Sequence, residues 1–279
     1  MNQSLTVLDP SSAASDDAAT IVRLFHRCEL DDARELGEET LLDAGIAICS
    51  PALARVSDAN RVFDAYVPDE MPVEHAAQDV LNHFASRGVT CRKWAPNPSS
   101  PPAQTARLTN HLESLGYVRH ASCIMRLMSR RTVHEPTTAG VTIIPARASF
   151  RHARTLAEFT AHDPWREPQL AGAAMARLDN PRYEQLIALR DGNAVASAAV
   201  LTAGEVGMVD TVFVVPEARR QGLGRLMMNR ILDHCARALF RHVLLRTNFD
   251  NTCALPLFKS LGFEPVGEFV EWVTPQARP

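Results

Sequence analysis

The segment Arg219–Gly224, with the sequence RRQGLG, constrains the fold more than any other part of this 279-residue chain. It follows a run rich in β-branched residues, 208–215, which ends at Pro216 and predicts a buried strand. After it, apolar side chains recur every four residues between Met227 and Leu239, as in an amphipathic helix. A glycine-bearing turn between a strand and a helix predicts a pyrophosphate site. Glycine lets the backbone approach a ligand, and the first helical turn offers unpaired N–H groups.

The glycine spacing separates this site from two other phosphate-binding motifs. No Gly-Lys-Ser/Thr follows, as a Walker A motif requires, and the spacing differs from the dinucleotide fingerprint G-x-G-x-x-G. Arg-x-x-Gly-x-Gly after a Val-Pro strand end instead resembles the acetyl-coenzyme A loop of the GNAT N-acetyltransferases. Downstream, Asn251, Ala254, Leu257 and Gly262 match that family's Asn-x-x-Ala-x-x-Leu-Tyr-x-x-x-Gly-Phe pattern. Two motifs in the right order make residues 141–273 strongly similar to this family.

The resemblance implies an α/β fold with a mixed sheet, and the second half shows the family's elements in order. We expect a strand at 141–144, helices at 151–160 and 170–178, and a hairpin at 183–189 and 194–201. A strand at 208–215 and a helix after the glycine turn should follow. The remaining elements are a strand at 243–247, a helix near Asn251 with Pro256 in its first turn, and a last strand at 268–273. The family usually closes with a hairpin, whereas this chain has one terminal strand. We therefore expect the first half to supply the wall of the acceptor cleft that the hairpin forms in the family.

The first half holds a fainter copy of the same ending. A strand at 89–94, a helix at 104–115 and a strand at 124–128 are expected, and Gly116 parallels Gly262 about one domain further along the chain. No Arg-x-x-Gly-x-Gly precedes this first strand. The chain therefore resembles a tandem GNAT protein, with a degenerate GNAT-like domain at 1–130, a polar linker at 131–140 and a GNAT N-acetyltransferase domain at 141–279. The polar cluster Asp58–Arg61 is interpreted as an Asx-turn between strands.

Composition argues against several other classes of protein. The chain is 46% hydrophobic and 22% charged, and its formal net charge of -3 provides no basic field for a nucleic acid. No apolar run approaches membrane-spanning length, and the N-terminus lacks the positive region of a signal peptide. The six cysteines form no C-x-x-C pair and lie mostly among apolar neighbours. We therefore expect a cytoplasmic protein with buried free thiols and no structural metal.

Acetyl transfer from a thioester to an amine needs a proton acceptor, because an alkylammonium has a pKa of about 10. Asp210 lies on the strand before the glycine turn, where many members of the family carry an acidic residue. Its apolar neighbours would raise its pKa toward that of a working base. An Asp that pairs structurally on the strand's other face is an equally weighted alternative. Glu205 and His162 are secondary candidates, each also explained as a loop residue.

The resemblance also implies which residues contact acetyl-coenzyme A. Two parallel strands that splay apart would hold the pantetheine arm, and the arginines and the helix start would hold the phosphates. The residues assigned to this binding are Phe213, Val214, Val215, Arg219, Arg220, Gln221, Gly222, Leu223, Gly224, Arg225, Asn251 and Phe258. Three cations near a helix N-terminus oppose its dipole unless an anion is bound there. Phe258 departs from the family, whose tyrosine at this position commonly protonates the leaving thiolate.

These features predict an acetyl-coenzyme A-dependent N-acetyltransferase that acts on the amine of a small molecule or peptide by direct transfer in a ternary complex. The alternative is a non-catalytic acyl-coenzyme A-binding regulator, which Phe258 and the degenerate first half both favour. No nucleic-acid or membrane partner is expected. The protein is expected to be a monomer or homodimer, because a fused pair of domains can replace the dimer contact of single-domain relatives.

Overall fold

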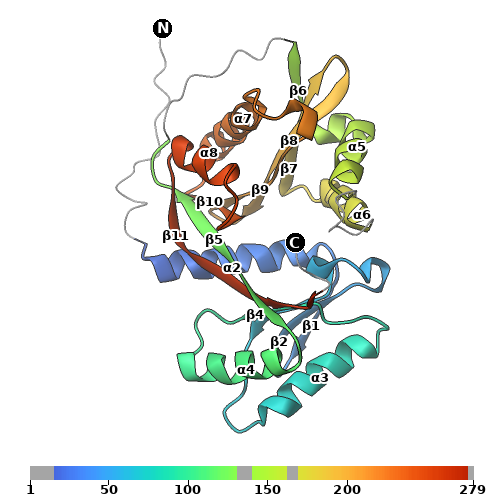
Figure 1. The fold of residues 1–279 in the computed structure, drawn as a ribbon, viewed down its shortest axis with the longest axis vertical. Coiled ribbons are helices and arrows are strands. Elements are labelled where there is room, and N and C mark those ends of the chain that lie inside the picture. Colours follow the sequence, from blue (N-terminus) through green and yellow to red (C-terminus); the bar gives the residue numbers. More distant parts are fainter. Residues whose placement is uncertain (1–15, 131–139, 162–168, 276–279) are drawn as a thin grey trace.

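One mixed sheet runs through the computed structural model, which describes residues 16–130, 140–161 and 169–275 (Figure 1). Within these residues the sheet has eleven strands in the order β1-β2-β3-β4-β11-β5-β10-β9-β8-β7-β6. The strands are β1 (Glu38–Leu42), β2 (Gly45–Cys49), β3 (Arg61–Ala65), β4 (Lys93–Pro96), β5 (Val118–Leu127), β6 (Val141–Pro145), β7 (Tyr183–Arg190), β8 (Asn193–Ala203), β9 (Val206–Val214), β10 (His242–Asn248) and β11 (Phe263–Val273). The mixed α/β fold expected from the sequence is confirmed.

The same order of elements occurs twice along the chain. Three antiparallel strands, β1 to β3 or β7 to β9, are followed by a helix, a strand parallel to the third, a second helix and a final strand. The helices are α3 (Val73–Ala85) and α4 (Pro102–Ser114) in the first half, and α7 (Leu223–Arg237) and α8 (Ala254–Leu261) in the second. The backbone order therefore repeats. The domain boundary at 131–140 stays a prediction, because residues 131–139 lie outside the described residues.

The final strands of the two halves are exchanged. β5, from the first half, lies between β10 and β11 and pairs antiparallel with both. β11, from the second half, reaches β4, where Trp272 pairs with Trp94. In Figure 1 these two long strands run side by side from one half of the molecule into the other. The first half thus supplies the strand next to β10, and its expected role as a wall of the acceptor cleft stays a prediction.

Helices cover both faces of the sheet. α2 (Ala18–Arg34), α5 (Phe150–Ala161) and α6 (Gln169–Ala176) pack on one face, around a core that includes residues of both halves such as Phe63 and Leu244. On the other face, α3 and α4 cover the first half, and α7 and α8 cover the second. None of the described helices is long and apolar enough to cross a membrane. Five of the six cysteines are buried free thiols, as predicted, and Cys253 is an exposed one.

α2 lies outside the elements predicted from the sequence, although its residues account for it. The side chain of Asp17 caps its start by accepting the N–H of Thr20 at 2.7 Å. Ile21, Phe25 and Cys28 then recur on one buried face. That face packs on β11 and also reaches β8 and β9, so the helix bridges the two halves.

Charged residues from both halves meet in the interior where the exchanged strands cross. Glu271 on β11 forms ion pairs with Arg61 on β3 and with Arg246 on β10 (3.2 Å), and the Lys93 ammonium on β4 lies 3.9 Å from its carboxylate. The side chains of Glu271 and Arg61 are each 1% exposed. Burial alone would raise the pKa of Glu271, but Lys93, Arg61 and Arg246 outweigh it and lower the pKa to about 2. An ionised carboxylate in the core therefore joins strands of both halves.

The segment Asp58–Arg61 belongs to this cluster, and the Asx-turn predicted for it is wrong. Asp58 lies in a 3-10 helix, Ser57–Ala59, and its carboxylate pairs with Lys93 at 2.7 Å and with Arg61 at 3.3 Å. The side-chain amide of Asn60 bonds to three backbone groups of the preceding loop. The local pattern misled the prediction because Lys93 comes from a distant strand.

Several predicted boundaries also shift. The strands predicted at 124–128 and 268–273 begin earlier, at Val118 and Phe263. α8 begins at Ala254, three residues after Asn251, with Pro256 in its first turn as predicted. The strand predicted at 89–94 begins only at Lys93, because the N–H of Val89 bonds back to the carbonyl of Phe84 at the end of α3. The backbone at Val89 is therefore still bonded to the end of α3, at a position where the sequence predicted strand pairing.

Replacing Glu271 with Gln should lower the free energy of unfolding by about 3 kcal/mol, because Arg61 and Arg246 would each lose one of two carboxylate partners and keep only Asp58 and Glu29, respectively. Glu268, on the same strand, forms an exposed ion pair with Arg119 and provides a matched control. Glu268→Gln should cost less than about 1 kcal/mol. Urea unfolding at neutral pH measures both values.

The pH dependence of this effect has a defined sign. The pKa of Glu271 falls on folding from its ordinary value of 4.5 to about 2, so its stabilisation is present above pH 4.5 and is lost as the pH falls through 2. Glu271→Gln should therefore lose less stability than the native chain across this interval. Equal losses in the two proteins would show that other carboxylates carry the acid sensitivity.

Candidate functional site

The sheet opens between β9 and β10. These strands run parallel and pair at three positions, from Val206 with His242 to Met208 with Leu244. β9 then continues to Val214 and β10 to Asn248 without pairing to each other. The predicted splay is therefore present, and it leaves backbone groups on facing strand edges where a ligand can bind.

β9 bulges beside this gap. Thr211 has a φ of 49°, in the left-handed region, and the register with β8 shifts between Ser197 and Ala199. The bulge interrupts the ladder and re-aims the neighbouring residues, as bulges do at active sites. Asp210, the predicted base, is the residue directly before the left-handed position.

The carboxylate of Asp210 is partly buried and held by two hydroxyl groups. Tyr183 on β7 donates to Oδ2 at 3.1 Å, and Thr211 donates to the same oxygen at 2.8 Å. Oδ1 accepts no hydrogen bond from a described residue. Burial and the nearby Asp210 carboxylate raise the pKa of Tyr183 well above its ordinary value, so the phenol remains a neutral donor. This arrangement orients one oxygen of Asp210 and leaves the other for a ligand or water.

Backbone groups at the end of β9 differ in their availability. The N–H of Val215 donates to the carbonyl of Val195 at 3.0 Å. The carbonyl of Val214 accepts a hydrogen bond from Arg219 Nε at 3.1 Å. Phe213 is partly buried, and its ring contacts that of Phe159 on α5. Of the three residues assigned to the pantetheine arm, Val215 thus has its amide already engaged.

The glycine turn forms a cradle, Arg219–Gly224, that leads into α7. Arg220 and Gly222 both adopt left-handed φ values, 62° and 82°, and Gly222 is the N-cap of the helix. No side chain among the described residues caps α7, so its first N–H groups remain available. Free amides at the positive end of a helix dipole favour an anion, in agreement with the pyrophosphate site predicted here.

The glycine at position 224 is not explained by contacts within the protein. A Cβ at this position would meet only ordinary contacts, with Leu257 at 3.4 Å and Val214 at 3.9 Å. Its φ is not in the left-handed region, and alanine is the better helix former. Packing and conformation therefore do not require glycine here, and the position agrees with the close approach of a phosphate that the sequence predicts.

The polar side chains of the cradle, and of Arg225 directly after it, have distinct partners. Arg225 donates to Ser260 Oγ at 3.1 Å, but its buried Nη1 has no hydrogen-bond partner among the described residues. Gln221 accepts from Arg190 and donates to the carbonyl of Glu217. Arg220 is exposed beside them. The unpartnered guanidinium nitrogen and the exposed arginine fit the phosphates of coenzyme A.

The second motif has structural roles that the sequence did not reveal. Asn251 Oδ1 accepts the N–H of Ala254 at 2.9 Å, so its side chain satisfies the first N–H group of α8. Phe258 is 5% exposed and packs edge-on against Phe263. The binding roles assigned to Asn251 and Phe258, like those of the cradle residues, stay predictions.

The secondary base candidates fit the site less well. Glu205 lies in the turn before β9, at the opposite end of the strand from the bulge, and pairs with Arg241 at 3.5 Å. A strand rises about 3.3 Å per residue, so six residues separate Glu205 from Thr211 by about 20 Å. His162 lies outside the described residues.

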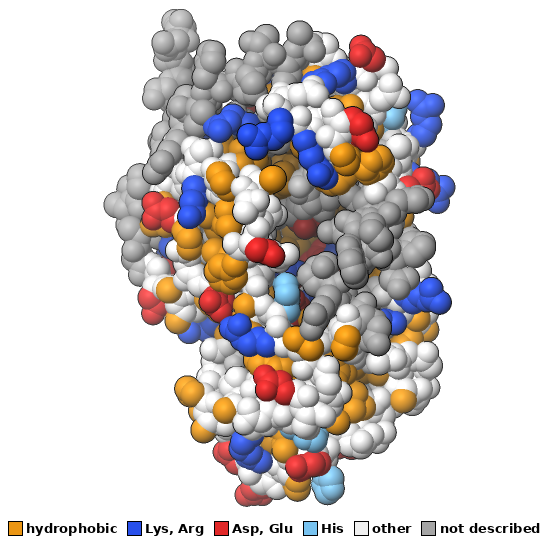
Figure 2. Space-filling view, viewed as in Figure 1, with side chains coloured by type: hydrophobic (Ala, Val, Ile, Leu, Met, Phe, Trp, Pro, Cys, Tyr) orange, Lys and Arg blue, Asp and Glu red, His pale blue; other side chains and the backbone are white. Residues whose placement is uncertain are grey.

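Sequence reasoning missed several charged residues that gather on the α2 side of the gap. Arg246 pairs with Glu29 of α2 at 3.1 Å, and Arg177 forms a bidentate pair with Asp32. Burial raises the pKa of Glu29 to about 7, against the opposing charges of Arg246 and Arg61. Figure 2 shows a hollow near the middle of the molecule with acidic and basic side chains at its base. The sequence signal that could have revealed this charged cluster is an acidic residue, Glu29, within the apolar stripe of a helix.

Comparisons with known proteins agree with this geometry. Residues 149–263 match the family model described as the acetyltransferase (GNAT) family. The chain is 33% identical over 94 residues to an IAA acetyltransferase of Azospirillum brasilense, covering 33% of this chain and 61% of that protein. It is 30% identical over 140 residues to the N-alpha-acetyltransferase RimI of Mycobacterium tuberculosis, covering 48% of this chain and 82% of that protein.

A solved structure shares the fold over nearly the whole chain. It is a GCN5-related N-acetyltransferase from Kribbella flavida, with a TM-score of 0.66 and 19% identity. The match covers 91% of this chain and 96% of that protein, so both halves take part. The family model, the curated relatives and the shared fold agree with one another. The chain therefore belongs to the GNAT family of acetyltransferases.

Proposed function

We propose that this protein is an acetyl-coenzyme A-dependent N-acetyltransferase that acetylates the amine of a small molecule or peptide by direct transfer in a ternary complex. The observation that carries the proposal is the continuity of one strand. β9 borders the gap to β10, bulges at Thr211 beside Asp210, and ends at the anion cradle. A thioester donor with a phosphate tail needs these three features in this order.

The residues present fit acetyl-coenzyme A, which would supply the thioester acetyl group. The amides at the start of α7 and the side chains of Arg220 and Arg225 are proposed to hold its phosphates. Phe213 and Val214 would face its arm in the gap and polarise the carbonyl through backbone amides. The buried Nη1 of Arg225, unpartnered among the described residues, supports this assignment.

Asp210 is proposed to accept the proton from the acceptor amine. Its Oδ2 is held by Tyr183 and Thr211, which leaves Oδ1 to face an ammonium or a bridging water. An ammonium with a pKa of about 10 must lose this proton before it attacks. A carboxylate held in one orientation can receive the proton without rearrangement.

The first half is proposed to be a degenerate GNAT-like domain that completes the acceptor cleft. Support comes from the repeated element order and from β5, which takes the place next to β10. α2 also brings Glu29 to Arg246 beside the gap. The acceptor would therefore contact both halves of the chain, with carboxylates available to attract a cationic amine.

A non-catalytic acyl-coenzyme A-binding regulator is the second candidate. Phe258 favours it, because phenylalanine has no proton for a leaving thiolate. Release of free thiol from acetyl-coenzyme A that depends on an added amine separates the two functions. An amine panel that produces no thiol would favour the regulator.

Gly224→Ala should weaken acetyl-coenzyme A binding while stabilising the fold by about 0.5–1 kcal/mol, because the methyl group fits the protein but occupies the path of the phosphate. Gly172→Ala on α6 is the control, since a Cβ there meets no atom within 4 Å. It should add similar stability and leave affinity unchanged. Calorimetric titration and urea unfolding measure the two effects. Unchanged affinity in Gly224→Ala would contradict the cradle.

Asp210→Asn should keep acetyl-coenzyme A affinity and reduce turnover by about 10²–10⁴-fold, most strongly at lower pH, where the amine is mostly protonated. Asp233→Asn, on the exposed side of α7, controls for loss of a carboxylate. Steady-state thiol release across pH gives the comparison. A loss smaller than about tenfold would return Asp210 to a structural role, with Glu29 next to be tested.

Phe258→Tyr should turn over faster and acquire a basic-limb pKa near about 10, the ordinary tyrosine value, if this position faces the sulfur. Phe263→Tyr adds a hydroxyl to the neighbouring ring, which is 1% exposed, and should change stability without changing the pH profile. An inactive native protein that gains activity through Phe258→Tyr would favour the regulator. An unaltered rate and profile would show that Phe258 packs away from the thioester.

A further inference from the structure

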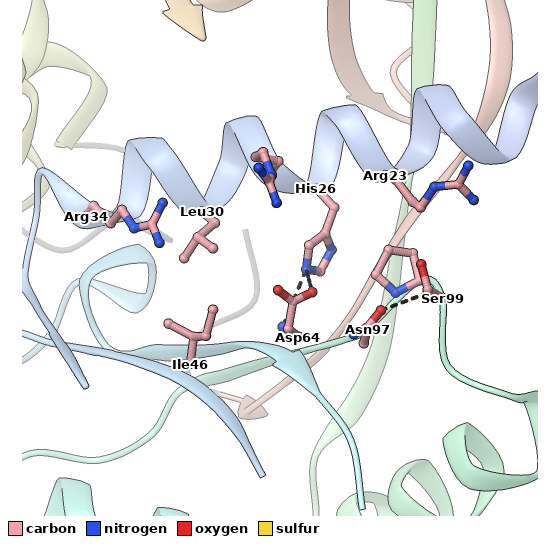
Figure 3. Close-up of a pocket in the computed structure, with 10 residues that line it drawn as sticks. Arg23, His26, Leu30, Arg34, Ile46, Asp64, Asn97 and Ser99 are labelled. Atoms are coloured by element: carbon pink, nitrogen blue, oxygen red, sulfur yellow. Dashed lines mark hydrogen bonds and ion pairs between the residues drawn. The ribbon is translucent and has the colours of Figure 1, made fainter. Parts of the chain in front are cut away.

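A second pocket lies wholly within the first half, between α2 and the ends of β3 and β4 (Figure 3). Its volume is about 370 Å³, enough for a molecule of amino-acid size. α2 forms one wall with residues between Arg23 and Arg34. Ile46 on β2, Asp64 on β3 and the loop Asn97–Ser99 form the other. None of the residues assigned to acetyl-coenzyme A lines this pocket.

This pocket is the first half's counterpart of the proposed transfer site, which is the gap between β9 and β10 beside Asp210. β3 bulges at Asp64, whose φ of 49° equals that of Thr211, and β4 runs parallel beside it. The segment after β3 forms no cradle, however. α3 follows Pro72 and carries Glu74 in its first turn, where a carboxylate opposes a phosphate. A ligand of this pocket therefore lacks the pyrophosphate tail of coenzyme A.

Asp64 presents an ionised carboxylate to the pocket. His26 extends from α2 toward it, with Nε2 3.1 Å from Oδ1 (Figure 3). The hydrogen bond from His26 and the charges of Arg27 and Arg34 hold the pKa of Asp64 below its ordinary value. Oδ2 accepts no hydrogen bond from a described residue. One carboxylate oxygen is thus fixed by His26, and the other can accept from an ammonium.

Arg27 supplies the complementary charge on the opposite wall. Its guanidinium has no hydrogen-bond or ion-pair partner among the described residues. Arg34, which also lines the pocket, is already neutralised by Asp31 and Glu39. Arg23, at the other end of the same wall, donates to the Thr20 hydroxyl and has no carboxylate partner among the described residues. Arg27 lies between Arg23 and Arg34 on the helix, and its planar donors suit a carboxylate.

The pocket also has an apolar end. Leu30 on α2 and Ile46 on β2 face one another in Figure 3, a short distance along the helix from His26. Both belong to one hydrophobic cluster and border the pocket beside the charged groups. An anion alone would be repelled by Asp64, and an amine alone would leave Arg27 unpaired, so the walls together match a zwitterion with an apolar substituent.

We propose that the first half binds a free amino acid with an apolar side chain, its ammonium on Asp64, its carboxylate on Arg27 and its side chain against Leu30 and Ile46. This binding is independent of the proposed acetyl transfer, because the two sites share no residue. It gives the degenerate half a function that needs neither coenzyme A nor a cradle.

Calorimetric titration of the full chain with L-valine, L-leucine and L-phenylalanine tests the proposal. At least one should bind saturably in the millimolar range. Two leucine analogues dissect the recognition: 4-methylpentanoate lacks the amine, and 3-methylbutylamine lacks the carboxylate. Each should bind at least about tenfold more weakly than leucine, because a charged hydrogen-bonding group of the pocket is left unpaired.

Matched variants locate the binding. Asp64→Asn removes the charge with a residue that tolerates the left-handed backbone, and it should weaken leucine binding about tenfold or more, as should Arg27→Gln. Asp210→Asn and Arg154→Gln, an exposed arginine on α5, should not change it. Circular dichroism verifies that each variant is folded.

Four results would overturn the proposal. They are the absence of saturable binding by all three amino acids, undiminished binding in Asp64→Asn, loss of binding in Asp210→Asn, and equal affinity for 4-methylpentanoate and leucine. The third would place the amino acid in the transfer site, and the fourth would reduce the pocket to an anion site. Acetyl transfer could fail entirely without affecting any of these readouts.

Discussion

The buried carboxylate of Glu271 is the constraint on which the joining of the two halves depends. A buried charge is tolerated only when its counterions are all in place, and here they come from β3, β4 and β10. Those strands are assembled around Glu271 only if β11 has crossed into the first half. The cluster thus couples the strand exchange to charge neutralisation, and separating the halves would leave uncompensated charges in the core.

Arg246 extends this charge cluster to the gap between β9 and β10. The same guanidinium pairs with Glu271 and with Glu29, so a residue of β10 beside the gap is held from two directions. Both carboxylates sit on elements that belong to or contact the first half. The first half therefore supplies β5 and α2, and α2 brings Glu29 to Arg246 beside the gap.

Local motifs allowed the strand, the glycine turn and the helix of the proposed cofactor end to be predicted, whereas the proposed acceptor end depends on distant partners. The strand, cradle and helix around Gly222 are contiguous, so their order and chemistry can be read from the sequence. The Tyr183–Asp210 hydrogen bond and the Glu29–Arg246 pair join elements far apart along the chain. Asp58 shows the cost of a local interpretation, because a turn pattern cannot reveal a partner such as Lys93. The short strands β1 to β3 carry too few alternating positions to be recognised.

The two bulges show how one backbone device serves different chemistry. Asp210 receives hydrogen bonds from two neutral hydroxyl groups, so its charge is not cancelled by a fixed cation among its hydrogen-bond partners. Asp64 instead is paired with His26, and the more distant charges of Arg27 and Arg34 also lower its pKa. A carboxylate with a lowered pKa is a poor proton acceptor, yet it still attracts an ammonium. The bulge of the first half is therefore suited to holding an amine without reaction, whereas the role proposed for Asp210 in the second half is to accept the proton.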